Sequence, residues 1–313
     1  MTTVSDRQRR MCTLLRALAA AEGYTQSALP GVRWLRSDRP LERTPVLYEP
    51  GIVFVCQGRK RGLFGDEWIV YDARHYLAVA VPVPFTMETD ASSAEPLLAI
   101  YMRLDPALAA ELLLAMERHR ATSTTCQPKG LAATRMDDRI EAALLRFLEA
   151  MSDPLEAEVL VPGLLREIYF HVLSGEQGAS MRAALTAHGH LGRIALAPRR
   201  IHSAYAQPLD VPALAREAGL GLAAFHLHFK TVTQTSPMQY LKSIRLHRAR
   251  LLMFRQGSTA AAAAHQVGYE SPSQFSREFK RLFGRSPTDE LARMRQSLAL
   301  TPSTDGEAFV SSH

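Results

Sequence analysis

Polar and basic side chains that can donate hydrogen bonds stand close together near the C-terminus of this sequence. Phe275 and Phe279 lie four residues apart, so on a helix they would share one apolar face. Gln274, Arg277 and Arg281 would then project away from that face. Amide and guanidinium groups placed in this way are typical of a recognition helix in the major groove. The pattern therefore indicates recognition of duplex DNA.

The same pattern occurs twice, with a period of 50 residues. The residues shared by the two copies are Phe225, Phe229, Lys230, Ser236, Pro237 and Leu241 in the first and Phe275, Phe279, Lys280, Ser286, Pro287 and Leu291 in the second. Ala215 and Gly219 return 49 residues later, as Ala264 and Gly268, because the turn of the second copy has one more residue. Such a period indicates two copies of one supersecondary unit.

The first copy carries the start and stop signals of two short helices. Asp210 can cap a helix over residues 211–218, and Gly219 can end it by adopting the left-handed conformation. A second helix is expected over residues 222–233. The turn between them is too short for independent helices, so the copy is predicted to be a helix-turn-helix unit.

The second copy repeats this arrangement with stronger signals. A helix over residues 259–266 is followed by Ser271 and Pro272, which are typical of the N-cap and the first helical position. Gly284 is expected to end the helix that follows. A long helix over residues 237–254 would join the two units; it carries Lys242, Arg245, Arg248 and Arg250. Those basic residues suit either contacts to phosphates or an ordinary solvated face.

The charge of the chain supports a nucleic-acid partner. The net charge of the 313 residues is +6, but residues 198–300 hold 15 Lys and Arg against 6 Asp and Glu, a net charge of +9. The remainder therefore carries −3, and the basic excess belongs to one region. The sequence offers no apolar run of membrane-spanning length and no convincing signal peptide, so we expect a soluble, cytoplasmic protein.

The preceding part of the chain predicts an α+β unit. Residues 28–104 contain short apolar runs separated by Gly, Asp and Pro, which are typical of a small antiparallel barrel or sandwich. Helical spacing begins after residue 105 and gives two apolar stripes, which are Leu108, Leu112, Leu113 and Met116, and Ile140, Leu144, Leu145 and Leu148. These stripes could join two chains in a homodimer or simply cover the barrel.

The three cysteines, Cys12, Cys56 and Cys126, are odd in number and widely spaced, which argues against disulfides and zinc sites. Cys56 lies in an apolar run and is interpreted as a buried hydrophobic residue, with a sensing role left open.

The C-terminal region resembles the AraC/XylS-type regulators. The matching residues include Ala264, Gly268-Tyr269, Ser271, Ser273, Phe275-Ser276-Arg277, Phe279-Lys280-Arg281, Phe283-Gly284 and Ser286-Pro287, and upstream Leu214-Ala215, Phe225-His226, His228-Phe229-Lys230, Tyr240 and Arg245-Leu246. Further matches, among them Leu47-Tyr48-Glu49-Pro50, Gln57-Gly58, Gly65-Asp66-Glu67 and Leu104-Asp105-Pro106-Ala107, resemble the N-terminal domain found in one branch of this family.

The resemblance implies a cupin-like β-barrel with appended helices, for sensing or dimerisation, followed by a seven-helix DNA-binding domain. It places six side chains against bases, namely Ala223, His226, Leu227, Ser273, Gln274 and Arg277. Three others would contact phosphates, namely Lys230, Lys280 and Arg281. The expected partners are double-stranded DNA, RNA polymerase, a small-molecule effector and a second copy of the chain, and the expected role is that of an activator.

Two departures from the family pattern stand out. Leu227 occupies a position that is often arginine, and Ala223 adds no polar group, so the first unit would read DNA through His226 and apolar contacts with thymine methyl groups. Pro198 stands near the start of the DNA-binding domain, where it is expected to break or restart a helix.

The resulting domain prediction is an N-terminal helical segment (1–27), a cupin-like domain (28–185), a linker (186–197), a DNA-binding domain (198–296) and a disordered tail (297–313). An effector pocket could lie among the aromatic residues Tyr48, Phe54, Tyr76 and Tyr101, which equally suit ordinary core packing.

Rival functions have less support in the sequence. A metal-dependent oxygenase would need several ligands, and the barrel segment has only His75. A DNA-repair methyl acceptor would need a reactive cysteine, and Cys126 has only Lys129 nearby. We therefore expect no catalytic residues, metal or cofactor. The remaining alternative is a DNA-binding regulator whose N-terminal domain only dimerises.

Overall fold

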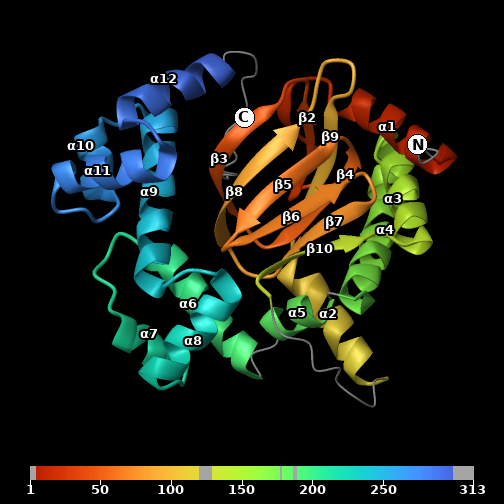
Figure 1. The fold of residues 1–313 in the computed structure, drawn as a ribbon. Coiled ribbons are helices and arrows are strands. Elements are labelled where there is room, and N and C mark those ends of the chain that lie inside the picture. The colour runs from red at the N-terminus through yellow and green to blue at the C-terminus, as the bar shows by residue number, and fades with distance from the viewer. Residues whose placement is uncertain (1–4, 120–128, 177, 186–188, 299–313) are drawn as a thin grey trace.

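The computed structural model describes residues 5–119, 129–176, 178–185 and 189–298. Ten strands lie in the first half of these residues and helices dominate the second half, with the two groups side by side (Figure 1). No helix within the described residues combines the length and apolar composition needed to cross a membrane.

The strands form two antiparallel sheets, which we call the β domain. The larger sheet has the order β1-β2-β9-β4-β7-β10 and the smaller one β3-β8-β5-β6. Their bounds are β1 Gly23–Gln26, β2 Val32–Ser37, β3 Leu41–Tyr48, β4 Gly51–Gln57, β5 Arg59–Phe64, β6 Glu67–Asp72, β7 His75–Val79, β8 Val83–Asp90, β9 Leu97–Arg103 and β10 Leu131–Arg135. In β8, Val83, Phe85 and Met87 point into the core while the residues between them are half-buried, the alternation expected of a strand with one buried face.

Five helices accompany the β domain: α1 Asp6–Leu18, α2 Pro106–Glu117, α3 Asp138–Ala150, α4 Pro154–Ser174 and α5 Gly178–Leu185. Helix α1 packs on β2, β4, β9 and α3, and α3 packs on α4 (Figure 1). The predicted apolar stripes lie inside this arrangement, because Leu112 and Leu113 of α2 and Ile140, Leu144 and Leu148 of α3 are buried within one chain. The stripes therefore pack within one chain, that of α3 beside α1 and α4 and that of α2 beside α4 and α5.

The C-terminal helices are α6 Gly189–Ala204, α7 Val211–Glu217, α8 Leu222–Thr233, α9 Pro237–Gln256, α10 Ala260–Gln266, α11 Pro272–Phe283 and α12 Pro287–Leu298. Figure 1 shows α7–α8 and α10–α11 near opposite ends of the long helix α9. The two predicted helix-turn-helix units are present, and the caps Asp210, Thr259 and Ser271 accept hydrogen bonds from backbone amides of the helices they begin.

The turns of the two units differ in how closely they are packed. Gly219 and Gly268 both have positive φ, at 63° and 87°. A Cβ atom on Gly268 would lie 2.5 Å from the carbonyl oxygen of Ala206, whereas one on Gly219 would meet only the Arg193 side chain, at 3.8 Å. The second turn therefore requires glycine for space as well as for backbone conformation.

The hydrophobic core is divided unequally between the two units. Phe225, Phe229, Tyr240 and Ile244 of the first unit belong to one continuous core with the β domain. The second unit has a separate core, made by residues of α9, α10 and α11 that include Met253, Phe275, Phe279 and Phe283. Only the first unit shares its interior with the β domain.

Helix α6 differs from the sequence expectation, because it continues through Pro198 and occupies residues expected to be a linker. Proline in a helix interior costs about 3 kcal/mol. Ile194, Ala195, Ala197 and Ile201 around it are all buried. Their packing offsets that cost, so the expected break at Pro198 was wrong.

Candidate DNA-binding interface

Helix α11 presents a polar face anchored by three buried phenylalanines. Phe275, Phe279 and Phe283 recur every four residues and are 0 to 7% exposed. This fixes which side of α11 remains outside. The five side chains predicted to contact DNA from α11 are all exposed: Ser273, Gln274, Arg277, Lys280 and Arg281. The structure thus brings them together on one helix.

Helix α8 repeats the arrangement with fewer polar groups. Phe225 and Phe229 are fully buried, and Ala223, His226, Leu227 and Lys230 are exposed. Leu227 is 67% exposed, which is unusual for a leucine and places an apolar surface beside His226. A thymine methyl group would be a suitable contact for such a surface.

A carboxylate on α11 is held by a hydrogen-bond network that the sequence did not reveal. Glu278 accepts hydrogen bonds from Lys242 Nζ at 2.8 Å, from Tyr269 Oη at 2.8 Å and from Gln274 Nε2 at 3.2 Å. Burial acts to raise the pKa of Glu278, but these hydrogen bonds outweigh it and lower the pKa. The negative charge of Glu278 is therefore compensated within the protein by Lys242.

The same network orients Gln274. One amide N–H of Gln274 is used by Glu278, which leaves the second N–H and the carbonyl oxygen available. A donor and an acceptor on one amide are what adenine recognition in the major groove requires. The four-residue spacing of Gln274 and Glu278 was visible in the sequence, whereas the approach of Lys242 depends on the tertiary fold.

Two basic residues of α9, Arg245 and Arg250, make contacts within the protein. Arg245 donates hydrogen bonds to the backbone carbonyls of Tyr205, Gly268 and Gln207, at 2.7, 2.9 and 3.1 Å. Arg250 is 1% exposed and pairs with Glu290 at 3.2 Å. Neither sequence interpretation, phosphate contacts or a solvated face, fits these two residues. They tie the units of the helical domain together.

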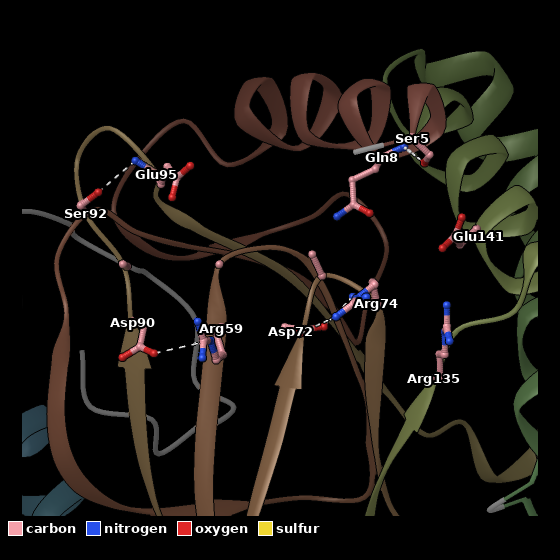
Figure 2. A pocket seen from close by; sticks show the side chains of 13 residues that line it. Ser5, Gln8, Arg59, Asp72, Arg74, Asp90, Ser92, Glu95, Arg135 and Glu141 are labelled. Atoms are coloured by element: carbon pink, nitrogen blue, oxygen red, sulfur yellow. Dashed lines mark hydrogen bonds and ion pairs between the residues drawn. The ribbon is translucent and has the colours of Figure 1, made fainter. Parts of the chain in front are cut away.

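The β domain has a charged groove of about 720 Å³ at one end of its sheets, shown in Figure 2. We call it the turn groove, because it lies among the β4–β5, β6–β7 and β8–β9 connections, with α1 and α3 beside it; its charged lining residues are Arg59, Asp72, Arg74, Asp90, Glu95, Arg135 and Glu141. Arg59 and Asp90 are 3.7 Å apart, and Arg74 and Asp72 are 3.9 Å apart, so both pairs are loose. A groove with both signs of charge suits a small polar molecule.

The four aromatic residues predicted as an effector pocket lie elsewhere. Tyr48, Phe54, Tyr76 and Tyr101 are at most 3% exposed and pack within the core, and the turn groove is lined by other residues. The Phe54 and Tyr76 rings are 5.6 Å apart, and the Tyr48 hydroxyl accepts a hydrogen bond from the buried Lys60 at 3.3 Å. A pocket among these aromatics stays a prediction.

Cys56 is fully buried, and burial raises the pKa of its thiol, with a smaller contribution from Cys12. Both features fit a core residue with low reactivity. Cys126 lies outside the described residues.

Comparison with known proteins identifies both parts of the chain. Residues 28–180 match the family model of the AraC-type transcriptional regulator N-terminus, and residues 214–293 match that of a helix-turn-helix domain. The chain belongs to the AraC/XylS-type regulators.

Curated relatives of this AraC/XylS-type chain match it in part. It is 30% identical over 121 residues to the HTH-type transcriptional regulator GlxA of Rhizobium meliloti, an alignment that covers 38% of this chain and 37% of the relative. It is 35% identical over 86 residues to the RCS-specific HTH-type transcriptional activator RclR of Escherichia coli, covering 28% and 30%. The chain thus spans about a third of the length of the curated relatives it matches.

The whole fold is similar to that of solved AraC/XylS-type proteins. An unsaturated-fatty-acid-bound ToxT from Vibrio cholerae superposes with a TM-score of 0.55 and 13% sequence identity, over 87% of this chain and 98% of ToxT. This likeness shows that the order of a β domain followed by a helical domain is shared.

Proposed function

We propose that this protein is a sequence-specific DNA-binding transcription regulator. The observation that supports the proposal is the pair of exposed faces on α8 and α11, each anchored by buried phenylalanines and held by the single helix α9. Recognition helices fixed in this way can enter two successive major grooves. The functional division is a sensing or dimerisation part over residues 28–185 and a DNA-binding part over residues 198–296.

DNase I and hydroxyl-radical footprinting of the full chain on a selected site tests this function. Protection on one face of the duplex over two adjacent major grooves is expected for each chain. The selected site is compared with a scrambled duplex of equal length, because nonspecific binding is driven by phosphate contacts alone. Protection of a single groove would contradict the two-unit arrangement.

As an activator, the protein would contact RNA polymerase from the promoter. Transcription in vitro from a promoter that carries the footprinted site measures this role directly. A rise in transcript when the protein is added supports activation, whereas a fall identifies a repressor that uses the same DNA contacts.

The turn groove supports a response to a small-molecule effector. Its volume of about 720 Å³ is within the range of ligand sites, and Arg135 and Glu141 come to it from different elements, β10 and α3. Burial and the neighbouring Asp138 raise the pKa of Glu141. A screen of zwitterionic and sugar-like compounds by thermal shift, repeated with Arg135→Gln, tests the site. If no hit depends on Arg135, the alternative of a β domain that only dimerises gains support.

We propose that two chains pair through the outer face of α4. Leu155, Val159 and Leu160 on this helix are 71, 64 and 49% exposed. These three side chains form an exposed apolar stripe that the same helix of a second chain could cover. A two-fold interface pairs the same surface of both chains, so α4 would contact α4 of the second chain.

A further inference from the structure

A second cavity lies at the junction between the β domain and the second helix-turn-helix unit. Its volume is about 250 Å³, and it is bounded by residues 39–45 on one side and by Phe283, Arg285, Glu290 and Arg293 on the other. Strand β3 packs on α9 and α11 at this junction, on the side of the β domain that faces the helical domain (Figure 1). A ligand placed here would touch both parts of the protein.

The lining of this cavity is dominated by guanidinium groups. Arg39 and Arg43 come from the β domain and Arg285 and Arg293 from the helical domain, so we call it the arginine cavity. Two glutamates, Glu42 and Glu290, also line it, which leaves an excess of two positive charges. Like charges brought together at an interface oppose its closure.

The carboxylate on the helical side is already shared among several arginines. Glu290 is 2% exposed and contacts Arg293 at 3.0 Å, Arg250 at 3.2 Å and Arg285 at 3.7 Å. Behind it, Arg250 is fully buried, and burial lowers the pKa of its guanidinium to about 10, still charged at neutral pH. One carboxylate therefore faces three cations.

The arginines of the β domain find carboxylates on their own side. Arg39 pairs with Glu22 at 3.1 Å, and Arg43 pairs with Glu88 at 3.6 Å while it lies over the Trp68 ring at 5.2 Å. The side chains of Arg43 and Arg285 remain 58 and 42% exposed. Their outer N–H groups can therefore reach a molecule in the cavity.

We propose that the arginine cavity binds a compact oxyanion carrying at least two negative charges, and that this anion joins β3 to α12. Guanidinium groups bind phosphate and carboxylate oxygens through paired hydrogen bonds, which favours planar or tetrahedral oxyanions over halides. The volume admits phosphate, pyrophosphate or a small polycarboxylate but is below that of most drug-sized sites.

An anion bound across the junction would stabilise the arrangement of the second unit against the β domain. A ligand that binds only the joined form raises the population of that form by mass action. The first unit already shares a core with the β domain, whereas the second has its own. The anion would therefore act mainly on the position of α11.

Isothermal titration calorimetry on the full chain without DNA tests the proposal. The probes are inorganic phosphate, inorganic pyrophosphate and citrate, each at constant ionic strength against potassium chloride. We expect saturable binding of at least one probe and none of chloride; phosphate and pyrophosphate together indicate a phosphate ligand, and citrate alone a carboxylate. Arg43→Gln and Arg285→Gln, one on each side, should each weaken binding on the order of tenfold, as loss of one charge-assisted hydrogen bond does.

Two controls keep the outcome unambiguous. Arg199→Gln removes an exposed arginine away from the cavity and should leave binding unchanged. Lys230→Ala combined with Lys280→Ala removes charge from the candidate DNA-binding faces. Loss of anion binding in that double variant, no saturable binding, or equal affinities in Arg43→Gln and the native chain would each overturn the proposal. DNA binding is measured separately, without added anion. A loss of DNA affinity in Arg43→Gln under those conditions would also overturn the proposal, because it would assign Arg43 to DNA phosphates.

Discussion

The hydroxyl of Tyr240 donates a hydrogen bond of 2.7 Å to the backbone carbonyl of Pro82. Tyr240 lies on α9 and Pro82 in the connection between β7 and β8, so this bond crosses from the helical domain to the β domain. The same hydroxyl lies 3.0 Å from Nε2 of His202 and, as a donor to Pro82, accepts from it. Burial, and secondly Arg248, lower the pKa of His202 to about 3, so the imidazole is neutral with its proton on Nε2.

Replacing Tyr240 by phenylalanine should weaken the coupling between the two domains. The change leaves the Pro82 carbonyl and the His202 N–H without this partner, at a cost of about 1–3 kcal/mol. Both tryptophans, Trp34 and Trp68, are in the β domain, so their fluorescence reports its unfolding, while far-UV circular dichroism reports mainly helices. In urea the two signals should coincide for the native chain and separate in Tyr240→Phe. Tyr205→Phe, at the residue that follows α6, is the control; identical curves for all three proteins would contradict the prediction.

Lys60 should make stability depend on pH. Its side chain is fully buried, and burial lowers its pKa to about 7, against about 10.4 in an unfolded chain. Between these two values the unfolded state binds more protons than the folded state. The contribution of Lys60 to the free energy of unfolding therefore rises with pH, by at most about 1.4 kcal/mol per pH unit. Below pH 7 the folded state carries the full cost of burying the charged amine. Lys60→Met should remove this rise and stabilise the protein most at low pH.

Urea unfolding at several pH values between 6 and 10 gives the difference in the free energy of unfolding between the native chain and Lys60→Met. Lys129→Met, whose side chain is 51% exposed in the native protein, is the matched control. A difference that stays constant across the range would show that Lys60 is not desolvated in solution.

Gly219→Ala and Gly268→Ala occupy equivalent turns and should differ in cost. Gly219→Ala should lower the free energy of unfolding by about 1 kcal/mol, because alanine is strained at positive φ. Gly268→Ala adds a clash with the Ala206 carbonyl and should lower the free energy of unfolding by about 3 kcal/mol or more. Chemical denaturation of both variants measures the ratio, and equal losses would mean that the Ala206 segment yields easily.

Arg277→Ala and Lys230→Ala should separate base recognition from phosphate binding. If Arg277 reads a base, its loss costs roughly 1–3 kcal/mol on the selected site and little on scrambled DNA. Loss of Lys230 should weaken binding to both duplexes alike and reduce the salt dependence. Fluorescence anisotropy at several salt concentrations distinguishes the two; uniform losses in both variants would remove Arg277 from base recognition.

Val159→Asp should shift the full chain from dimer to monomer. The residue is 64% exposed on α4, so the substitution places a charge in the proposed interface without disturbing the core. Sedimentation velocity at micromolar concentration measures the change, and Met238→Asp, at a site 42% exposed on α9, carries the same charge elsewhere. A native chain that sediments as a monomer contradicts the dimer.

The DNA-binding helices were predictable because their signals are local. Ser271 and Pro272 at the start of α11 and Gly284 at its end act within a few residues, and the structure has the helix between them. The 50-residue period added a second, independent indication. Pro198 was misleading, since the packing of α6 against its neighbours is not visible in the local sequence.

The β domain was predictable in class but not in detail. Strands β1, β2, β5, β8 and β10 were not assigned, because their apolar patterns are short or interrupted by polar and charged residues. β5 begins Arg59-Lys60-Arg61, which reads as an exposed segment, yet alternation turns Lys60 inward. The Tyr240–Pro82 contact joins residues 158 positions apart and leaves no trace in local spacing.

The unequal division of the core has a consequence for synthesis on the ribosome. The chain emerges from its N-terminus, so the β domain is complete before α8 and α9 appear, and the first unit can finish its interior on a surface that already exists. The second unit closes later, from its own residues. A chain truncated near Gly257 should therefore still fold, as a protein with a single helix-turn-helix unit.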